Sequence, residues 1–159
     1  MLSANDNEVL VRTGPGTPMG EYFRRYWLPV ALSEELPERD GPPKRLRMLG
    51  EELVAFRDTQ GRVGVIEPAC AHRGANLFYG RNEEGGLRCI YHGWKYDVEG
   101  RCIEMPNVPA GAAMHGKVSI KAYPTREFGD MVWAYFGPRE KMPELPHLEP
   151  ACCPRAIAL

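Results

Sequence analysis

Two short stretches decide how this chain is interpreted: CAHRG at residues 70–74 and CIYHGW at residues 89–94. Each supplies one cysteine and one histidine, spaced Cys-x-His in the first and Cys-x-x-His in the second, with a glycine just beyond the histidine. Each begins at an expected strand end, and glycine permits a sharp turn there. We therefore expect two glycine-bent loops that face each other across a small cavity, each offering one sulfur and one imidazole nitrogen.

The candidate metal ligands are Cys70, His72, Cys89 and His92. They suit a two-iron, [2Fe-2S] cluster with both thiolates on one iron and both imidazoles on the other. Neutral imidazoles in place of two thiolates remove negative charge, so such a cluster accepts an electron more easily than one with four thiolates. Each imidazole also keeps a second ring nitrogen for a proton or a hydrogen bond, so electron and proton movement can be coupled.

Zinc is the alternative metal, because two cysteines and two histidines are also a common zinc set. Zinc fingers usually group the two cysteines in one knuckle and the two histidines in the other. Here the two residue types alternate along the chain. This alternation, with the glycine and aromatic residues around it, favours the two-iron cluster.

Length and composition predict one globular domain. The chain has 159 residues, of which 43% are hydrophobic and 26% charged. A net charge of −1 gives no reason to expect nucleic acid or an anionic membrane as a partner. Residues 1–16 lack a signal-peptide pattern, and the apolar run 131–136 is too short to span a bilayer. We expect a soluble, cytoplasmic protein without a disulfide framework.

Short apolar runs punctuated by Gly, Pro and Asp predict a mostly β chain with antiparallel strands. The predicted strands cover residues 46–49, 52–57, 63–67, 87–91, 95–97, 117–121 and 131–136. Hairpin turns are expected at residues 58–61 and 97–100. Cys102 is expected to be a small buried apolar side chain.

One helix is predicted over residues 18–27, with Thr17 as its N-cap and Pro18 at its first position. Its aromatic side chains are expected to pack onto the sheet along one helical face: Tyr22, Phe23, Tyr26 and Trp27. Residues 137–150 carry four prolines and no clear periodicity. They are expected to form a linker or an extended arm rather than a core element.

The two stretches resemble the Rieske motif of the ring-hydroxylating oxygenases. The wider chain is similar to the phthalate dioxygenase branch through EYFRRYWLPV at residues 21–30, GWKYD at 93–97 and EMP at 104–106. The resemblance spans most of residues 15–137. It implies a Rieske-type antiparallel β-sandwich with two cluster-binding loops and a short N-terminal helix.

The same resemblance suggests a domain division. Residues 1–36 would form a helical or extended segment, residues 37–137 the Rieske [2Fe-2S] domain, and residues 138–159 a proline-rich arm. The arm would lead to a catalytic domain outside this chain, so we expect the sequence to be the N-terminal portion of a longer oxygenase.

Two differences from the respiratory-chain Rieske proteins are informative. Those proteins carry an additional cysteine in each loop, and the two form a disulfide, whereas this sequence has Ala75 and Tyr91 at the corresponding places. A serine that donates a hydrogen bond to a bridging sulfide is replaced here by Trp94. With fewer donors the negative charge on the sulfurs is less stabilised, which predicts a low-potential, oxygenase-type centre.

In the resembled oxygenases the Rieske domain passes electrons to a mononuclear non-haem Fe(II) held by two histidines and a carboxylate. This chain has four histidines, and the two outside the motif are His115 and His147. Neither has the Asp/Glu-x-x-His-x₄-His context, and both are expected to be exposed to solvent. No catalytic residue is therefore assigned, and we expect no oxygenase activity from this chain alone. Cys152 and Cys153 are expected to be reduced thiols.

Two functions remain open. The first is the electron-transfer domain of an oxygenase that dioxygenates, hydroxylates or O-demethylates an aromatic substrate. The second is a free-standing Rieske ferredoxin. The helical segment and the arm favour the first function, because a carrier needs little beyond the cluster domain.

The resemblance also implies partners. The expected electron donor is a flavin/iron-sulfur reductase, and the expected acceptor is a neighbouring oxygenase subunit in a homotrimer of the full-length protein. His72 and His92 should then lie at a surface tip. The residues flanking them are Arg73, Tyr91 and Trp94. They are candidates for docking a partner, or they simply shield the cluster from water, and the sequence does not distinguish these two roles.

Overall fold

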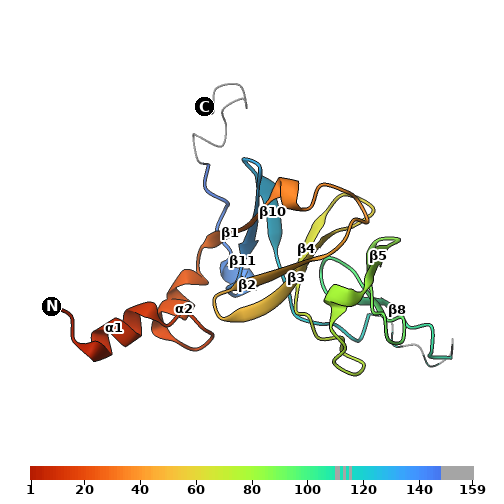
Figure 1. Ribbon diagram of the computed structural model, residues 1–159, viewed down its shortest axis with the longest axis horizontal. Coiled ribbons are helices and arrows are strands. Elements are labelled where there is room, and N and C mark those ends of the chain that lie inside the picture. Colours follow the sequence, from red (N-terminus) through yellow and green to blue (C-terminus); the bar gives the residue numbers. More distant parts are fainter. Residues whose placement is uncertain (110–111, 113, 115, 148–159) are drawn as a thin grey trace.

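The computed structural model describes residues 1–109, 112, 114 and 116–147. In this part of the chain the strands form three antiparallel sheets, with two short helices before the first strand (Figure 1). The predicted mostly β, antiparallel class with a short N-terminal helix is therefore confirmed. His115, Cys152 and Cys153 lie outside the described residues, as does the end of the predicted arm.

Two sheets form the base of the molecule. The first has the strand order β1-β11-β10, and the second has the order β2-β3-β4-β9. The strand bounds are β1 Trp27–Leu32, β2 Lys44–Met48, β3 Glu51–Arg57, β4 Val63–Ile66, β9 Ala122–Tyr123, β10 Thr125–Phe128 and β11 Met131–Tyr135. Buried side chains of both sheets share one core, so the two sheets pack against each other.

The third sheet carries the site. Its order is β5-β6-β7-β8, with β5 at Arg81–Glu83, β6 at Gly86–Arg88, β7 at Lys95–Tyr96 and β8 at Cys102–Glu104. Side chains from this sheet and from β3 and β4 form a second core. A strand points successive side chains to opposite faces. Leu53 and Ala55 of β3 accordingly enter the base core, while Val54 and Phe56 enter the core beneath the site.

The sequence-based strands are correct where both faces are buried. The predicted strand 87–91 ends instead at Arg88, because Cys89 begins a loop, and the predicted strand 117–121 is reduced to one bridge between Ser119 and Arg101. The strands β1, β5, β8, β9 and β10 were not predicted. The two hairpin turns are confirmed: Gly61 donates to the Asp58 carbonyl at 2.8 Å, and Gly100 to the Asp97 carbonyl at 2.9 Å.

The helix α2 (Pro18–Phe23) begins as predicted, with the Thr17 hydroxyl accepting a hydrogen bond from the Gly20 amide. It is shorter than predicted because Trp27 starts β1. The expected packing of its aromatic side chains is wrong for Tyr22 and Tyr26. These are about half exposed and contact each other, with ring centroids 5.3 Å apart.

An additional helix, α1 (Ala4–Val11), precedes α2 and has a capping box formed by Ser3 and Asp6. The part of the chain that the structure describes also contains the short 3₁₀ helices η1 (Ser33–Glu35), η2 (Leu77–Tyr79) and η4 (Arg139–Lys141). No helix in the described ranges is long and apolar enough to cross a bilayer.

The first part of the proline-rich arm belongs to a small third core, contrary to the prediction. Met142 and Leu145 pack against the buried aromatic side chains of Trp27, Trp133 and Tyr135. The indole Nε1 of Trp27 donates to the Pro143 carbonyl at 2.8 Å. The composition of this segment predicts an arm, because the sequence of the segment itself does not reveal the aromatic surface against which it packs.

Candidate metal centre

The first candidate loop, loop 1, comprises residues 70–75 and follows β4. The Cys70 amide donates to the Ala75 carbonyl at 3.0 Å, and the Gly74 amide donates back to the Cys70 carbonyl at 2.8 Å. Gly74 has a φ of 70°, a conformation that glycine adopts without steric cost. His72 is the third residue of this turn.

The second loop, loop 2, comprises residues 89–94 and joins β6 to β7. It repeats the same frame: the Cys89 amide donates to the Trp94 carbonyl at 2.8 Å, and the Gly93 amide to the Cys89 carbonyl at 3.0 Å. Gly93 has a φ of 77°. Its histidine, His92, is the fourth residue, so the two different Cys–His spacings occupy one common backbone frame.

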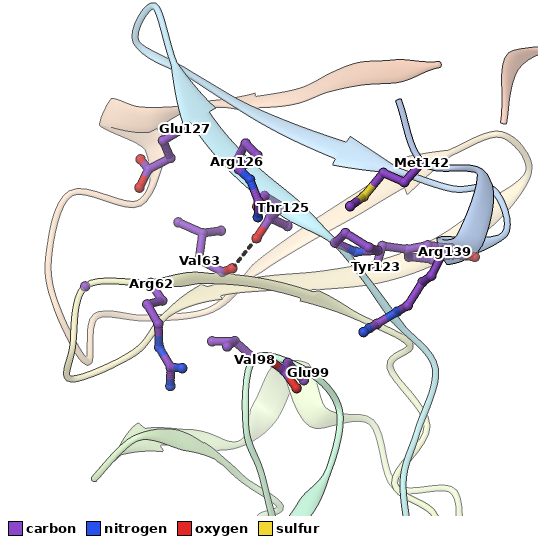
Figure 2. Close-up of a pocket in the computed structure, with 12 residues that line it drawn as sticks. Arg62, Val63, Val98, Glu99, Tyr123, Thr125, Arg126, Glu127, Arg139 and Met142 are labelled. Atoms are coloured by element: carbon purple, nitrogen blue, oxygen red, sulfur yellow. Dashed lines mark hydrogen bonds between the residues drawn. The ribbon is translucent and has the colours of Figure 1, made fainter. Parts of the chain in front are cut away.

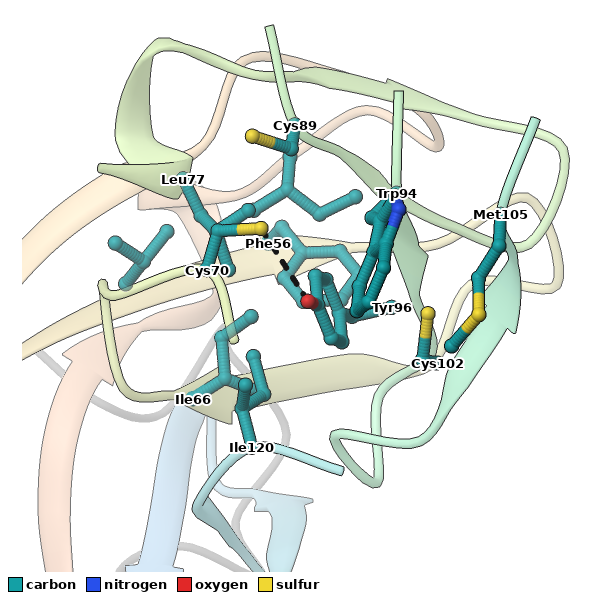
Figure 3. Close-up of a cluster of buried hydrophobic side chains, with 12 residues drawn as sticks. Phe56, Ile66, Cys70, Leu77, Cys89, Trp94, Tyr96, Cys102, Met105 and Ile120 are labelled. Carbon is teal, nitrogen blue, oxygen red and sulfur yellow. Dashed lines mark hydrogen bonds between the residues drawn. The ribbon is translucent and has the colours of Figure 1, made fainter. Parts of the chain in front are cut away.

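The two cysteines lie in the core between these loops, as Figure 3 shows. Cys70 and Cys89 are each only 3% exposed, and neither forms a disulfide. Burial raises the pKa of the Cys89 thiol; amides of Tyr91 and His92 oppose this shift, and the adjacent Cys70 adds to it. A thiolate so far from water needs a positive partner, so this pair of sulfurs suits a bound metal.

The two histidines meet nearer the surface. Their ring centroids are 4.6 Å apart, and both residues are partly exposed. Nδ1 of His72 is buried and has no hydrogen-bond partner among the residues that the structure describes. Burial, followed by the charges of His72 and Arg73, lowers the pKa of His92, which favours the neutral imidazole that binds metals. An unpaired buried nitrogen costs about 1–3 kcal/mol, and a metal at that atom would remove this cost.

The candidate ligands therefore form two pairs, two sulfurs in the core and two imidazoles towards the surface. Within the ranges that the structure describes, no three His, Cys, Asp or Glu side chains gather around one point suited to a single metal ion. Paired thiolates and paired imidazoles are what a two-iron cluster of mixed ligation requires. The residues present fit that group.

Tyr96 is a site residue that the sequence analysis missed. Its hydroxyl lies 3.3 Å from the Cys70 sulfur and accepts a hydrogen bond from the Ala71 amide at 3.1 Å. Since the amide uses an oxygen lone pair, the phenolic proton is available to the sulfur. Burial, followed by the contact with Cys70, raises the pKa of Tyr96, which keeps this proton in place. The sequence signals for Tyr96 were its place in the predicted strand 95–97 and in the GWKYD stretch at residues 93–97.

Trp94 is not placed for docking, one of the two roles considered for it. It is buried rather than available for docking, and its ring stacks on His72 with centroids 4.7 Å apart. Its Nε1 donates to the Asn107 side chain at 2.7 Å, so this donor points away from the sulfurs. Arg73 and Tyr91 are exposed as expected, and exposed Ile90 lies next to Tyr91.

The remaining cysteine and histidine in the described residues lie outside the two loops, although Cys102 belongs to the same core as Cys70, Cys89 and Tyr96. Cys102 is fully buried as expected, donates to the Glu104 carbonyl at 3.4 Å, and has a pKa raised by burial to about 11. His147 is exposed as expected and contacts the Phe128 ring.

A cavity of about 560 Å³ lies elsewhere, where β4 and β10 approach the turn between β7 and β8 (Figure 2). The cavity is lined by arginine side chains from separate segments of the chain: Arg62, Arg126 and Arg139. None of the four candidate ligands lines this cavity.

Comparison with known proteins identifies the class. Residues 26–124 match the family of the Rieske [2Fe-2S] domain, and the chain belongs to this family. It is 52% identical over 154 residues to the oxygenase subunit of phthalate 4,5-dioxygenase from Pseudomonas putida. That alignment covers 97% of this chain but 35% of the relative, so the chain spans about a third of the relative's length.

Two solved structures have the same fold. Dicamba monooxygenase, crystallised with non-haem iron and dicamba, matches with a TM-score of 0.71 and 27% identity over 83% of this chain and 40% of that one. A complex of the oxygenase and ferredoxin of carbazole 1,9a-dioxygenase matches with a TM-score of 0.67 and 31% identity. That match covers 86% of this chain and 33% of the other.

Proposed function

We propose that this chain is the electron-transfer domain of a Rieske oxygenase, with Cys70 and Cys89 binding one iron of a [2Fe-2S] cluster and His72 and His92 binding the other. The observation that carries the proposal is the arrangement of these side chains in two pairs, on two loops with one backbone frame. A bound cluster would take up and release one electron.

The surrounding residues support that role. Tyr96 places a hydroxyl beside the Cys70 sulfur, where a hydrogen bond stabilises negative charge. Trp94 covers one face of the His72 ring, and the apolar core excludes water from the sulfurs. The imidazoles reach the surface beside exposed Arg73 and Tyr91, the side from which an electron partner would approach.

We further propose a flavin/iron-sulfur reductase as electron donor and the mononuclear iron of a neighbouring oxygenase subunit as acceptor, in a homotrimer of the full-length protein. The similarity to oxygenase subunits along 97% of this chain supports an oxygenase over a free-standing ferredoxin. Substrates would be aromatic, as the names of phthalate 4,5-dioxygenase and carbazole 1,9a-dioxygenase suggest. The division at residues 37 and 137 and the cytoplasmic location remain part of this proposal.

The first test is the metal itself. The purified chain should be red-brown, contain iron and acid-labile sulfide in equal amounts, and give on reduction the electron paramagnetic resonance signal of a Rieske cluster. A colourless chain with stoichiometric zinc would end the proposal.

A second test separates electron transfer from oxygenation. The chain should accept electrons from a reductase but form no product from aromatic acids with oxygen and ferrous iron. The four histidines of the sequence leave only His115 and His147 once the cluster is ligated. Hydroxylated product from this chain alone would contradict the proposed division of labour.

A further inference from the structure

The two loops share a backbone frame but differ in the residue that precedes the cysteine. Ala69 precedes Cys70 in loop 1, and Arg88 precedes Cys89 in loop 2. Nη1 of Arg88 donates to the Gly93 carbonyl at 3.1 Å. Among the residues that the structure describes, no side chain donates to the corresponding carbonyl of Gly74. Within the described ranges, loop 2 is therefore held by a charged side-chain donor from outside its own turn and loop 1 is not.

The Arg88 guanidinium is itself fixed by carboxylates. Its Nε contacts Glu83, and its Nη2 donates to Glu104 at 2.7 Å. Glu104 is also bound by Lys95, whose side chain is only 1% exposed. Burial tends to raise the pKa of Glu104, but Lys95 and Arg88 outweigh it and lower the pKa, so the carboxylate stays charged. These ion pairs therefore fix the position of the Arg88 guanidinium, whose Nη1 donates to Gly93.

Gly93 is confined on its other side as well. A Cβ at this position would lie 2.8 Å from Cγ of Pro106 and 4.0 Å from Nη1 of Arg88. At Gly74 in loop 1, an added Cβ would meet no atom of the described residues within 4 Å. Loop 2 is therefore packed between Pro106 and Arg88, whereas loop 1 has open space at the equivalent residue.

We propose that Arg88 is a positioning residue for His92: by holding the carbonyl of Gly93, it fixes loop 2 in the conformation that presents the histidine to the cluster. Gly93 directly follows His92, so a shift of this peptide would move the imidazole. The inference rests on the proposed function, because the position matters only if His92 is a ligand. Both the charge and the shape of the Arg88 side chain contribute to this positioning. Its planar guanidinium can bind Gly93, Glu83 and Glu104 at once, whereas the ammonium group of a lysine at this position would be a compact point charge.

The test compares Arg88→Gln with Arg81→Gln. Arg81 is the cross-strand partner of Arg88, has the same charge and also contacts Glu83, but its side chain is 72% exposed. No hydrogen bond joins Arg81 to loop 2 among the described residues. Arg81→Gln therefore controls for loss of a positive charge on this sheet.

Amide hydrogen exchange of the metal-free chain is the first measurement, because it does not depend on the cluster. In Arg88→Gln the amides of Cys89 and Gly93 should exchange about tenfold faster, the effect expected when a hydrogen bond from a charged donor is lost. The amides of Cys70 and Gly74 should be unchanged, and Arg81→Gln should change neither loop. Equal acceleration in both loops, or in neither, would overturn the proposal.

The second measurement is made on the cluster-loaded chain. Arg88→Gln should lose iron faster than wild type during dialysis against a chelator and should show a shifted paramagnetic resonance signal, while Arg81→Gln should match wild type. Arg88→Lys keeps the positive charge but lacks the planar set of N–H donors of the guanidinium. It should be intermediate both in the rate of iron loss and in the paramagnetic resonance signal. A wild-type signal and iron retention in Arg88→Gln would count against the role of Arg88.

Two outcomes are kept separate by this design. A wild-type chain without a Rieske signal would remove the proposed function, whereas the exchange experiment would still report whether Arg88 holds loop 2. If Arg88→Gln fails to fold, the amides of β3 and β4 will lose their protection from exchange. Glu83→Gln is then used in its place, because it removes only one contact of the Arg88 guanidinium. Unaltered exchange of loop 2 in Glu83→Gln and Arg88→Lys would then reject the positioning role.

Discussion

Loop 1 and loop 2 place equivalent candidate ligands on equivalent turns, yet the structure supports them by different means. In loop 1 the support acts at the sulfur, where the Tyr96 hydroxyl contacts Cys70 and the Ala71 amide. In loop 2 it acts at the backbone beyond the histidine, where Arg88 and Pro106 confine Gly93. Repetition of a turn therefore does not imply repetition of its environment, because different residues surround the two loops.

This difference makes the two loops matched controls for each other. Changes at the ligands should affect both loops alike, while changes in their surroundings should affect one loop and spare the other.

The largest effect is expected from the ligands. Cys70→Ser and Cys89→Ser should each abolish most cluster binding, because a hydroxyl is a much poorer iron ligand than a thiolate. Iron and sulfide analysis with the visible spectrum measures the loss. Cys102→Ser is the control, since this buried thiol lies outside both loops and should leave the cluster in place. A normal spectrum in Cys89→Ser would show that the ligand set is wrong.

The next effect separates the loop glycines. Gly74→Ala and Gly93→Ala both place a side chain at positive φ, which costs about 1–2 kcal/mol. At Gly93 the contact with Pro106 adds a packing cost of about 1–3 kcal/mol. Urea denaturation of the metal-free chain should show a larger loss of unfolding free energy for Gly93→Ala. Equal losses would mean that Pro106 does not confine loop 2.

A smaller effect is expected at Tyr96. Tyr96→Phe removes the hydroxyl beside the Cys70 sulfur, so added negative charge is less stabilised and the reduction potential should fall. A hydrogen bond worth about 1 kcal/mol corresponds to about 40 mV for one electron. Protein-film voltammetry measures the shift, and Tyr91→Phe, whose side chain is exposed, serves as the control. A potential unchanged by Tyr96→Phe would remove this residue from the site.

The smallest effect is expected from acid. The hydrogen bond from Arg88 lowers the pKa of Glu83, and Lys95 and Arg88 lower that of Glu104 against the opposing effect of burial. Carboxylates with lowered pKa values stabilise the fold fully above their usual pKa of 4.5. That contribution is lost as the pH falls through the lowered values.

Amide exchange of the metal-free chain, corrected for its intrinsic pH dependence, tests this expectation. Loop 2 should keep its protection from pH 7 to 5 and lose it before loop 1 below pH 4.5. Parallel loss in the two loops would show that the carboxylates around Arg88 do not hold loop 2.

Much of the site could be predicted from the sequence because the ligands and their turns are local. Each cysteine, its histidine and its glycine fall within six residues, so spacing alone indicates both loops. The strands β3, β4 and β11 were also predicted, since β3 and β4 are buried on both faces and appear as continuous apolar runs. The strands β5 and β8 were not predicted because each has only three residues, too short a stretch to show a pattern, and β5 has no apolar residue.

The sequence by itself determined the four candidate ligands, their division between two loops and the mostly β class, because these depend on residue type and near-neighbour spacing. Only the tertiary structure decided that Tyr96 serves loop 1, that Arg88 holds loop 2 and that Trp94 covers His72 instead of facing solvent. Those contacts depend on strand pairing and on which side of each strand faces the core. The position of residues 142–145 was also decided by the tertiary structure. They pack against the aromatic surface around Trp27, a residue distant from them in the sequence.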